Sequence, residues 1–429
     1  MPIGQQWKMV ASRALLFLML LLVPLAGCAF HSGSDALAFL RDGQLWTVQA
    51  DGANLHQVAS GGIVSFSWSP DHRQFVYRTA SPFPDNRRQT PIENAPDLSG
   101  NLSVVSVNGG SAIPITPDAS ALARSDAWWN PNGNRLLYAE RFPTSGGLDD
   151  AAEYVVAQAD QPVGIASKAV PDAASLPAVS ADGAQVATIN AQNELLVGAA
   201  GAPGKMVTSG VLRQLPNTSR PGRVLWRPRS SDLLYAMVAN GAVQLTLREA
   251  SGATRALGSV PTLFDAAFSP DGAWLLVRTP ETFVLWDVKT PGSARYQWEN
   301  LDQTAIPYWA PDSRRILVFD AAGASLVDPT AQTQRAAIKY NKPHVTAPGS
   351  PPHWRPAPGG PWSPDGGSVT FVAAVGDSWN GEKLSTAGLY VVAINGGVQV
   401  GSARLIDNGA DEAPFWGYLD ASASFLLPS

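Results

Sequence analysis

Short apolar segments recur along the chain, and each of them directly follows a turn signal. Seven are clear: residues 74–77, 135–138, 185–188, 233–235, 274–277, 315–318 and 368–371. They are rich in β-branched and aromatic residues, which are typical of strands. Two further apolar segments, residues 282–288 and 388–394, indicate additional strands in the same units. The pattern predicts an all-β chain that is built from repeated units.

The turn signal is itself a repeated motif, whose fullest copies are residues 268–272 and 362–366. An aromatic residue is followed by Ser, Pro, Asp and Gly. Pro presets φ for a tight turn, Asp bonds back to the backbone, and Gly accepts a positive φ. We therefore interpret the polar residues at the fourth place as turn formers: Asp71, Asn132, Asp182, Asp271, Asp312 and Asp365.

The first residue of the motif recurs about every 50 residues, a period typical of propeller blades with four strands each. Its eight copies are Trp68, Trp129, Val179, Trp226, Phe268, Trp309, Trp362 and Trp416. Eight copies favour eight antiparallel blades. Because the last copy has lost its Pro, seven blades are the alternative. The tryptophans repeat with the fold, so we expect them to pack between blades.

The two ends of the repeat region complement each other. Residues 35–58 have the pattern of the later strands of a blade, whereas residues 413–427 have that of a first strand pair. Joining them in one blade would close the ring and remove exposed sheet edges. The sequence therefore predicts that N-terminal and C-terminal strands share a closing blade.

The repeated motif resembles that of the TolB-type, WD40-like (PD40) β-propellers, across nearly all of residues 36–427. The resemblance implies a propeller domain that covers residues 35–429. A fold shared by proteins of many activities does not by itself specify an activity.

The N-terminal segment has the features of a secretory signal. Lys8 and Arg13 precede an apolar run at residues 14–23, which is shorter than the ~20 residues of a membrane-spanning helix. Residues 25–28, Leu-Ala-Gly-Cys, resemble the lipobox of bacterial lipoproteins. This implies removal of residues 1–27, acylation of Cys28, and a tether at residues 28–34. The alternative is an ordinary signal peptide with a chance cysteine.

Cys28 is the only cysteine, so no disulfide forms within one chain. The lipobox resemblance implies that acyl chains anchor the protein to the outer face of the cytoplasmic membrane or to the outer membrane. The sequence leaves the choice of membrane open.

The charge distribution and the absence of known motifs restrict the partners and activities that we expect. The 30 basic and 35 acidic residues show no long run of one sign, so nucleic acid is not an expected partner. None of the five histidines has metal-ligand spacing, and no second cysteine could hold zinc. The chain also has no nucleophile elbow and no phosphate-binding loop. We therefore expect no metal, no cofactor and no enzymatic activity.

Four insertions interrupt the repeat: residues 80–101, 141–152, 340–360 and 376–387. In an antiparallel blade, successive connections between strands alternate between the two faces of the ring. Connections from the second to the third strand and connections to the next blade therefore share a face, so we expect all four insertions on one face. Rigidly supported loops with aromatic and charged residues are suited to recognition. The candidate partner-binding residues are Arg87, Arg88, His353, Trp354, Trp379 and Lys383, with the two tryptophans as exposed anchors. The alternative is that these are tolerated loops without a function.

The leading hypothesis is a membrane-anchored, non-enzymatic propeller that binds a protein or an envelope polymer through this insertion-rich face. One alternative is a propeller enzyme, such as a lyase, glycosidase or cyclase. Another is a sensor that binds a small ligand in the central channel. Two carboxylates within about 5 to 10 Å of each other in a funnel would favour glycoside chemistry.

Overall fold

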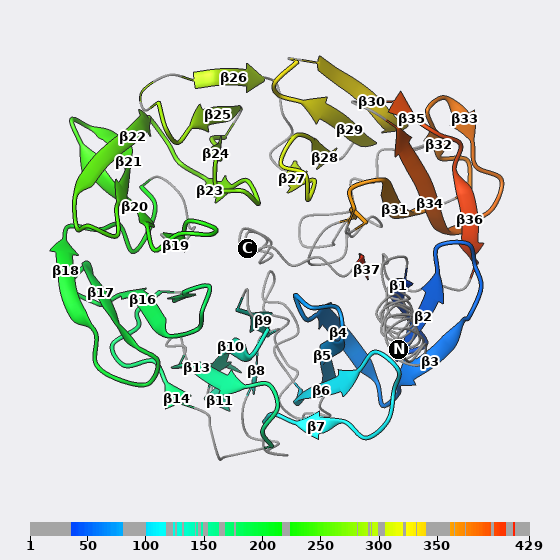
Figure 1. Cartoon of the computed structure of the whole chain (residues 1–429), viewed down its shortest axis with the longest axis horizontal. Helices are drawn as coiled ribbons and strands as arrows, with labels where there is room; N and C mark the ends of the chain where they lie inside the picture. Colours follow the sequence, from blue (N-terminus) through cyan, green and yellow to red (C-terminus); the bar gives the residue numbers. More distant parts are fainter. Residues whose placement is uncertain are drawn as a thin grey trace, which may run out of the picture. The chain divides into compact units, whose positions relative to one another are not determined.

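The computed structural model is an eight-bladed ring of antiparallel sheets (Figure 1). It describes residues 36–79, 100–116, 123–124, 127–130, 133–141, 143–144, 147–148, 153–162, 168–175, 177–216, 224–280, 282–290, 292, 294–298, 305–320, 323–331, 333–339, 361–363, 365–373, 375–395, 399–408 and 415–416. The first strand of each blade, such as β19, β23 and β27, lies nearest the centre. The predicted fold class and blade number are confirmed.

The blades are numbered from the N-terminal side of the ring. Within each blade, the strands are given in order from the centre of the ring outward. Blade 1 consists of β37 (Phe415–Trp416), β1 (Ala36–Arg41), β2 (Gln44–Gln49) and β3 (His56–Ala59). Blade 2 consists of β4 (Ile63–Trp68), β5 (Gln74–Thr79), β6 (Leu102–Ser106) and β7 (Ile113–Pro114). In blade 3, β8 (Ala123–Arg124) and β9 (Trp128–Trp129) both pair with β10 (Arg135–Arg141), followed by β13 (Glu153–Gln158) and β14 (Lys168–Ala169). Its long connection holds a hairpin of β11 (Pro143–Thr144) and β12 (Gly147–Leu148). Blade 4 consists of β15 (Ala178–Val179), β16 (Gln185–Ile189), β17 (Glu194–Ala199) and β18 (Lys205–Ser209).

Blades 5 to 8 complete the ring. Blade 5 consists of β19 (Leu225–Trp226), β20 (Leu233–Ala239), β21 (Ala242–Arg248) and β22 (Thr254–Val260). Blade 6 consists of β23 (Asp265–Phe268), β24 (Trp274–Arg278), β25 (Phe283–Asp287) and β26 (Ala294–Trp298). Blade 7 consists of β27 (Ile306–Trp309), β28 (Ile316–Asp320), β29 (Gly323–Asp328) and β30 (Thr333–Lys339), extended by β32 (Ser378–Trp379) and β33 (Glu382–Lys383). In blade 8, Trp362 bridges to β31 (Ser368–Ala373), which pairs with β34 (Gly388–Asn395); β35 (Gln399–Val400) and β36 (Arg404–Asp407) pair with β34 in turn.

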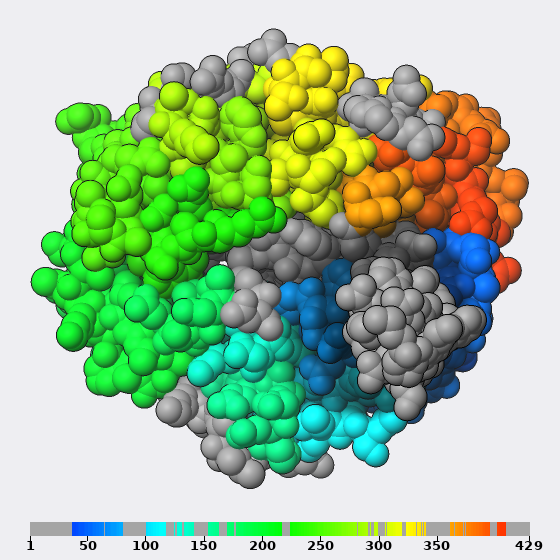
Figure 2. Space-filling view, in the orientation of Figure 1, coloured from blue at the N-terminus to red at the C-terminus, as the bar shows by residue number. Residues whose placement is uncertain are grey.

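The ring closes through both ends of the repeat region, as the sequence predicts. Strand β37 pairs with β1 in the register Leu37↔Trp416 and Ala38↔Phe415. Blade 1 is also tied to blade 8, because Arg41 forms an ion pair with Asp407 and Arg404 donates to the Ala50 carbonyl. Figure 2 shows the orange and red surface of blade 8 lying against the blue surface of blade 1.

The motif tryptophans join neighbouring blades at their first strands. The indole Nε1 of Trp129 donates to the Ser67 carbonyl at 3.4 Å, that of Trp226 to the Ala178 carbonyl at 3.0 Å, and that of Trp362 to the Tyr308 carbonyl at 3.0 Å. Each acceptor lies on the first strand of the preceding blade, one residue before that blade's own motif. The indole therefore fills the wedge between two blades and satisfies a carbonyl there.

In the part of the chain that the structure describes, no helix is both long enough and apolar enough to span a membrane.

Candidate functional site

The carboxylates of the motif are occupied within their own turns. Oδ1 of Asp71, Asp182, Asp271 and Asp365 accepts the Ser hydroxyl two residues earlier, at 2.5–2.6 Å. The same oxygen accepts the backbone N–H two residues later. Asp312 accepts the Arg314 N–H in the same way. Each of these carboxylates thus stabilises a tight turn in a separate blade.

Hydrogen bonding also lowers the pKa of two of these carboxyl groups. Bonds from the Ser180 hydroxyl and the Ala184 N–H hold the pKa of Asp182 below its ordinary value. Partial burial raises the pKa of Asp365, but bonds from Ser363 and the Gly367 N–H outweigh it, so the pKa again lies below the ordinary value. Both groups are therefore carboxylates at neutral pH, stabilised as hydrogen-bond acceptors.

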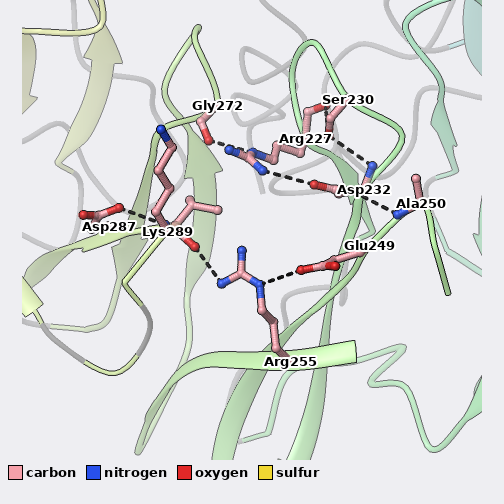
Figure 3. Close-up of polar contacts among 10 residues, drawn as sticks. Arg227, Ser230, Asp232, Glu249, Ala250, Arg255, Gly272, Asp287 and Lys289 are labelled. Carbon is pink, nitrogen blue, oxygen red and sulfur yellow. Dashed lines mark hydrogen bonds and ion pairs between the residues drawn. The ribbon is translucent and has the colours of Figure 1, made fainter. Parts of the chain in front are cut away.

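Turns of neighbouring blades are connected by arginine. Figure 3 shows Arg227 of blade 5 donating from Nε to the Gly272 carbonyl in the blade 6 turn, at 2.8 Å, while Nη1 contacts Asp232 at 3.1 Å. Arg315 of blade 7 likewise donates to the Gly366 carbonyl in the blade 8 turn, at 2.6 Å, and its guanidinium is held by Asp312 at 2.8 Å. These contacts make the face that carries the motif turns a connected structural layer.

The four long connections start from the opposite face. Residues 80–101, 141–152 and 376–387 follow the second strands β5, β10 and β31, and residues 340–360 follow the last strand β30. Second and fourth strands of an antiparallel blade end on the same side, so all four connections start on one face of the ring. We call it the insertion face. Asn132 of the motif turns, and Cys28, Arg87, Arg88, His353 and Trp354 of the predicted sites, lie outside the described residues.

Trp379 is not an exposed anchor, and that prediction is wrong. Its side chain is only 1 % exposed. The indole stacks on Phe371 with ring centroids 5.0 Å apart, and Nε1 donates to the Gly401 carbonyl at 2.8 Å. The strand that carries it, β32, pairs with the edge of β30, so the insertion is partly built into blade 7. Lys383 and Glu382 on the neighbouring β33 are exposed.

A pocket of about 690 Å³ opens between blades 5 and 6. Its walls come from the end of β22, the link to β23, the turn between β24 and β25, and strands β25 and β26. The lining residues are Gly258, Ser259, Val260, Pro261, Thr262, Thr279, Pro280, Thr282, Val284, Trp286, Gly292 and Gln297. The link and the turn belong to the insertion face. Sequence patterns do not reveal this pocket, because its residues carry no motif and come from two blades.

Among the described residues, no group of three or more His, Cys, Asp or Glu side chains is placed to hold a metal ion.

Comparison with known proteins supports the fold. No protein-family model matches the chain, and no curated protein matches it. Among solved structures, a eukaryotic initiation factor shares 12 % identity, with 90 % of this chain and 99 % of that chain covered and a TM-score of 0.51. An oligogalacturonate lyase in complex with manganese shares 14 % identity over 82 % of each chain, at a TM-score of 0.43. TolB from Acinetobacter baumannii shares 13 % identity over 70 % of this chain and 63 % of that chain, at a TM-score of 0.36. At 12 % identity the likeness to the initiation factor concerns the fold alone, and the sheets of this chain make it an eight-bladed β-propeller.

Proposed function

We propose that this protein is an exported, lipid-anchored propeller that binds a protein or an envelope polymer through its insertion face, without catalysing a reaction. The observation that carries the proposal is the unequal length of the connections on the two faces. All four long connections start on the insertion face, whereas the motif face is made of short turns whose carboxylates serve their own backbone. Long loops on a rigid scaffold are the usual place of recognition.

The anchor in this proposal rests on residues 25–28, which resemble a lipobox. Acyl chains contribute ~0.8 kcal/mol per buried CH₂, so more than one chain holds a protein stably at a bilayer surface. Cys28→Ser is expected to move the protein from the membrane fraction to the soluble fraction, or to leave the signal uncleaved. Equal membrane retention of a processed Cys28→Ser protein would rule the anchor out.

Partner binding is tested by crosslinking and pull-down from intact membranes. One variant replaces residues 340–360 by a short turn, and a second carries Arg87→Ala and Arg88→Ala. The matched control carries Arg73→Ala and Arg314→Ala, two exposed arginines in motif turns on the opposite face. We expect the wild type and the control to recover the same partner, and both insertion-face variants to lose most of it because they lack the contacting loop or its charges. Recovery by all four proteins would show that recognition lies elsewhere.

A further inference from the structure

The first two long connections of the insertion face start and end in neighbouring blades. Each has a root, by which we mean the two strand ends that it joins. The root in blade 2 consists of the end of β5 and the residues that lead into β6. The root in blade 3 consists of the end of β10 and the start of β13. Figure 1 shows these strands in adjacent blades, so one side chain between the blades can contact both roots.

The root in blade 2 is closed by direct contact between its two sides. The Thr79 N–H at the end of β5 donates to the Asn101 carbonyl at 3.0 Å. Gly100 lies so close that a Cβ there would be 1.5 Å from the Thr79 carbonyl oxygen, and its φ of 140° also favours glycine. One residue further on, the Leu102 N–H donates to the Thr116 hydroxyl at 2.9 Å. This root is therefore narrow and has a defined geometry.

The root in blade 3 places two carboxylates on neighbouring strands. Glu140 on β10 is the cross-strand partner of Glu153 on β13, and like charges in such positions repel. On its other side, Glu140 is the cross-strand partner of Arg124 on β8. Nε of Arg124 donates to Oε1 of Glu140 at 2.9 Å, so the guanidinium offsets this repulsion. Arg124 therefore supports the closed form of this root.

Arg124 also contacts the root in blade 2. Its Nη1 donates to Oδ1 of Asn101 at 2.9 Å and to the Gly100 carbonyl at 3.4 Å. The side chain of Arg124 is 0 % exposed and that of Glu140 is 14 % exposed. A planar guanidinium presents several donors in a fixed fork, which the single amine of lysine does not. One buried side chain thus joins the roots of two connections that belong to different blades.

We propose that Arg124 is a positioning residue that couples these two roots, so that the insertion face of blades 2 and 3 forms one recognition surface. Its use in recognition rests on the proposed function, whereas the coupling is a property of the chain alone. A buried ion pair is by itself weak evidence for stability. A guanidinium held from two blades, however, fixes the position of one root relative to the other, and a change at either root reaches the other through it.

Amide hydrogen exchange followed by mass spectrometry tests the coupling without any partner. Glu140→Gln in blade 3 should speed exchange in residues 100–106 of blade 2 roughly threefold or more. Because coupling is reciprocal, Asn101→Ala in blade 2 should likewise speed exchange in residues 153–158 of blade 3. Both effects pass through one side chain, so the double variant should show less than the product of the two single effects at each root.

The matched control is Asp232→Asn. Asp232 holds Arg227 at 3.1 Å and is 13 % exposed, close to the exposure of Glu140, but this ion pair lies in blade 5 on the motif face. The control should leave exchange at both roots unchanged. Melting temperatures of all variants verify that the ring is intact.

The role in recognition is tested by the pull-down from intact membranes. Glu140→Gln and Asn101→Ala should both recover clearly less partner than the wild type, whereas Asp232→Asn should recover as much. The proposal is overturned if exchange changes only in the substituted blade, if the single effects multiply in the double variant, or if both variants recover the partner fully. If the wild type captures no partner while the roots are coupled, the proposed function fails and the coupling stands.

Discussion

At the scale of single residues, the boundaries between blades differ in whether the indole N–H of the motif tryptophan has a hydrogen-bond acceptor. Nε1 of Trp226 donates to the Ala178 carbonyl at 3.0 Å. The equivalent atom of Trp309 is buried, and no acceptor among the described residues lies within hydrogen-bond reach of it. The same motif position thus makes a polar contact at one boundary and an apolar contact at the other.

This difference gives a prediction. Trp226→Phe and Trp309→Phe both replace an indole by a phenyl ring, but only the first breaks a hydrogen bond, which contributes about 1 kcal/mol net. Trp226→Phe should therefore lower the free energy of unfolding by about 1 kcal/mol more than Trp309→Phe does. Urea unfolding followed by circular dichroism measures the difference. Equal losses would mean that the indole N–H adds nothing to its packing.

Local turn chemistry could be predicted at this scale, whereas contacts between blades could not. The Ser–Asp bonds form within the motif, so its residue types suffice to expect them. The fifth residue of the motif has a positive φ. Gly272 and Gly366 occupy this position in two blades, but His72 at φ 58° and Ser313 at φ 60° occupy it in two others. Arg227 and Arg315 reach carbonyls 45 and 51 residues away. No periodic pattern identifies which side chain spans that separation.

At the scale of elements, the hairpin of β32 and β33 covers the outer edge of blade 7. It leaves blade 8, pairs with β30 through Ile338↔Trp379 and Lys339↔Ser378, and extends the sheet to six strands. Asn380 at its tip donates its N–H to the Ala337 carbonyl at 2.7 Å and accepts from Arg335. Covering an edge in this way protects it from pairing with other chains.

The hairpin provides a second prediction. Trp379→Ala should destabilise the protein by roughly 3–5 kcal/mol, because it removes a buried aromatic side chain and leaves a cavity against Phe371. Lys383→Ala in the same hairpin is exposed and should change stability by less than about 0.5 kcal/mol. Thermal and urea unfolding of the two variants provide the comparison. A Trp379→Ala protein as stable as the wild type would contradict the stacking of Trp379 on Phe371.

The sequence places this hairpin in an insertion but does not reveal its partner strand. Because residues 376–387 interrupt the repeat, the sequence predicts that Trp379 lies in a loop. The pairing of β32 with β30 is not predicted, because it joins segments about 40 residues apart. The pocket between blades 5 and 6 escapes prediction for a related reason. Periodicity predicts the strands within a blade, whereas a pocket depends on how two blades separate.

At the scale of the whole molecule, closure through β37 couples the two ends of the repeat region. Removing residues 413–429 deletes β37 and exposes the edge of β1. We expect a single, cooperative transition at a clearly lower melting temperature, because blades 1, 2 and 8 lose support together. Removing only residues 421–429 keeps β37 and serves as the matched control. If both truncations melt like the full chain, the ring is held by contacts other than β37.

The shared blade also imposes an order on assembly. Blades 2 to 6 are each encoded by one continuous stretch of chain and can form their sheets as that stretch is completed. Blade 1 is completed later, since β37, which pairs with its earliest strand β1, follows at residues 415–416. A chain that stops anywhere before residue 415 leaves the same backbone edge of β1 unpaired. Only a chain that extends through β37 covers that edge, so an exposed β1 edge distinguishes a chain that stops before β37 from one that contains it.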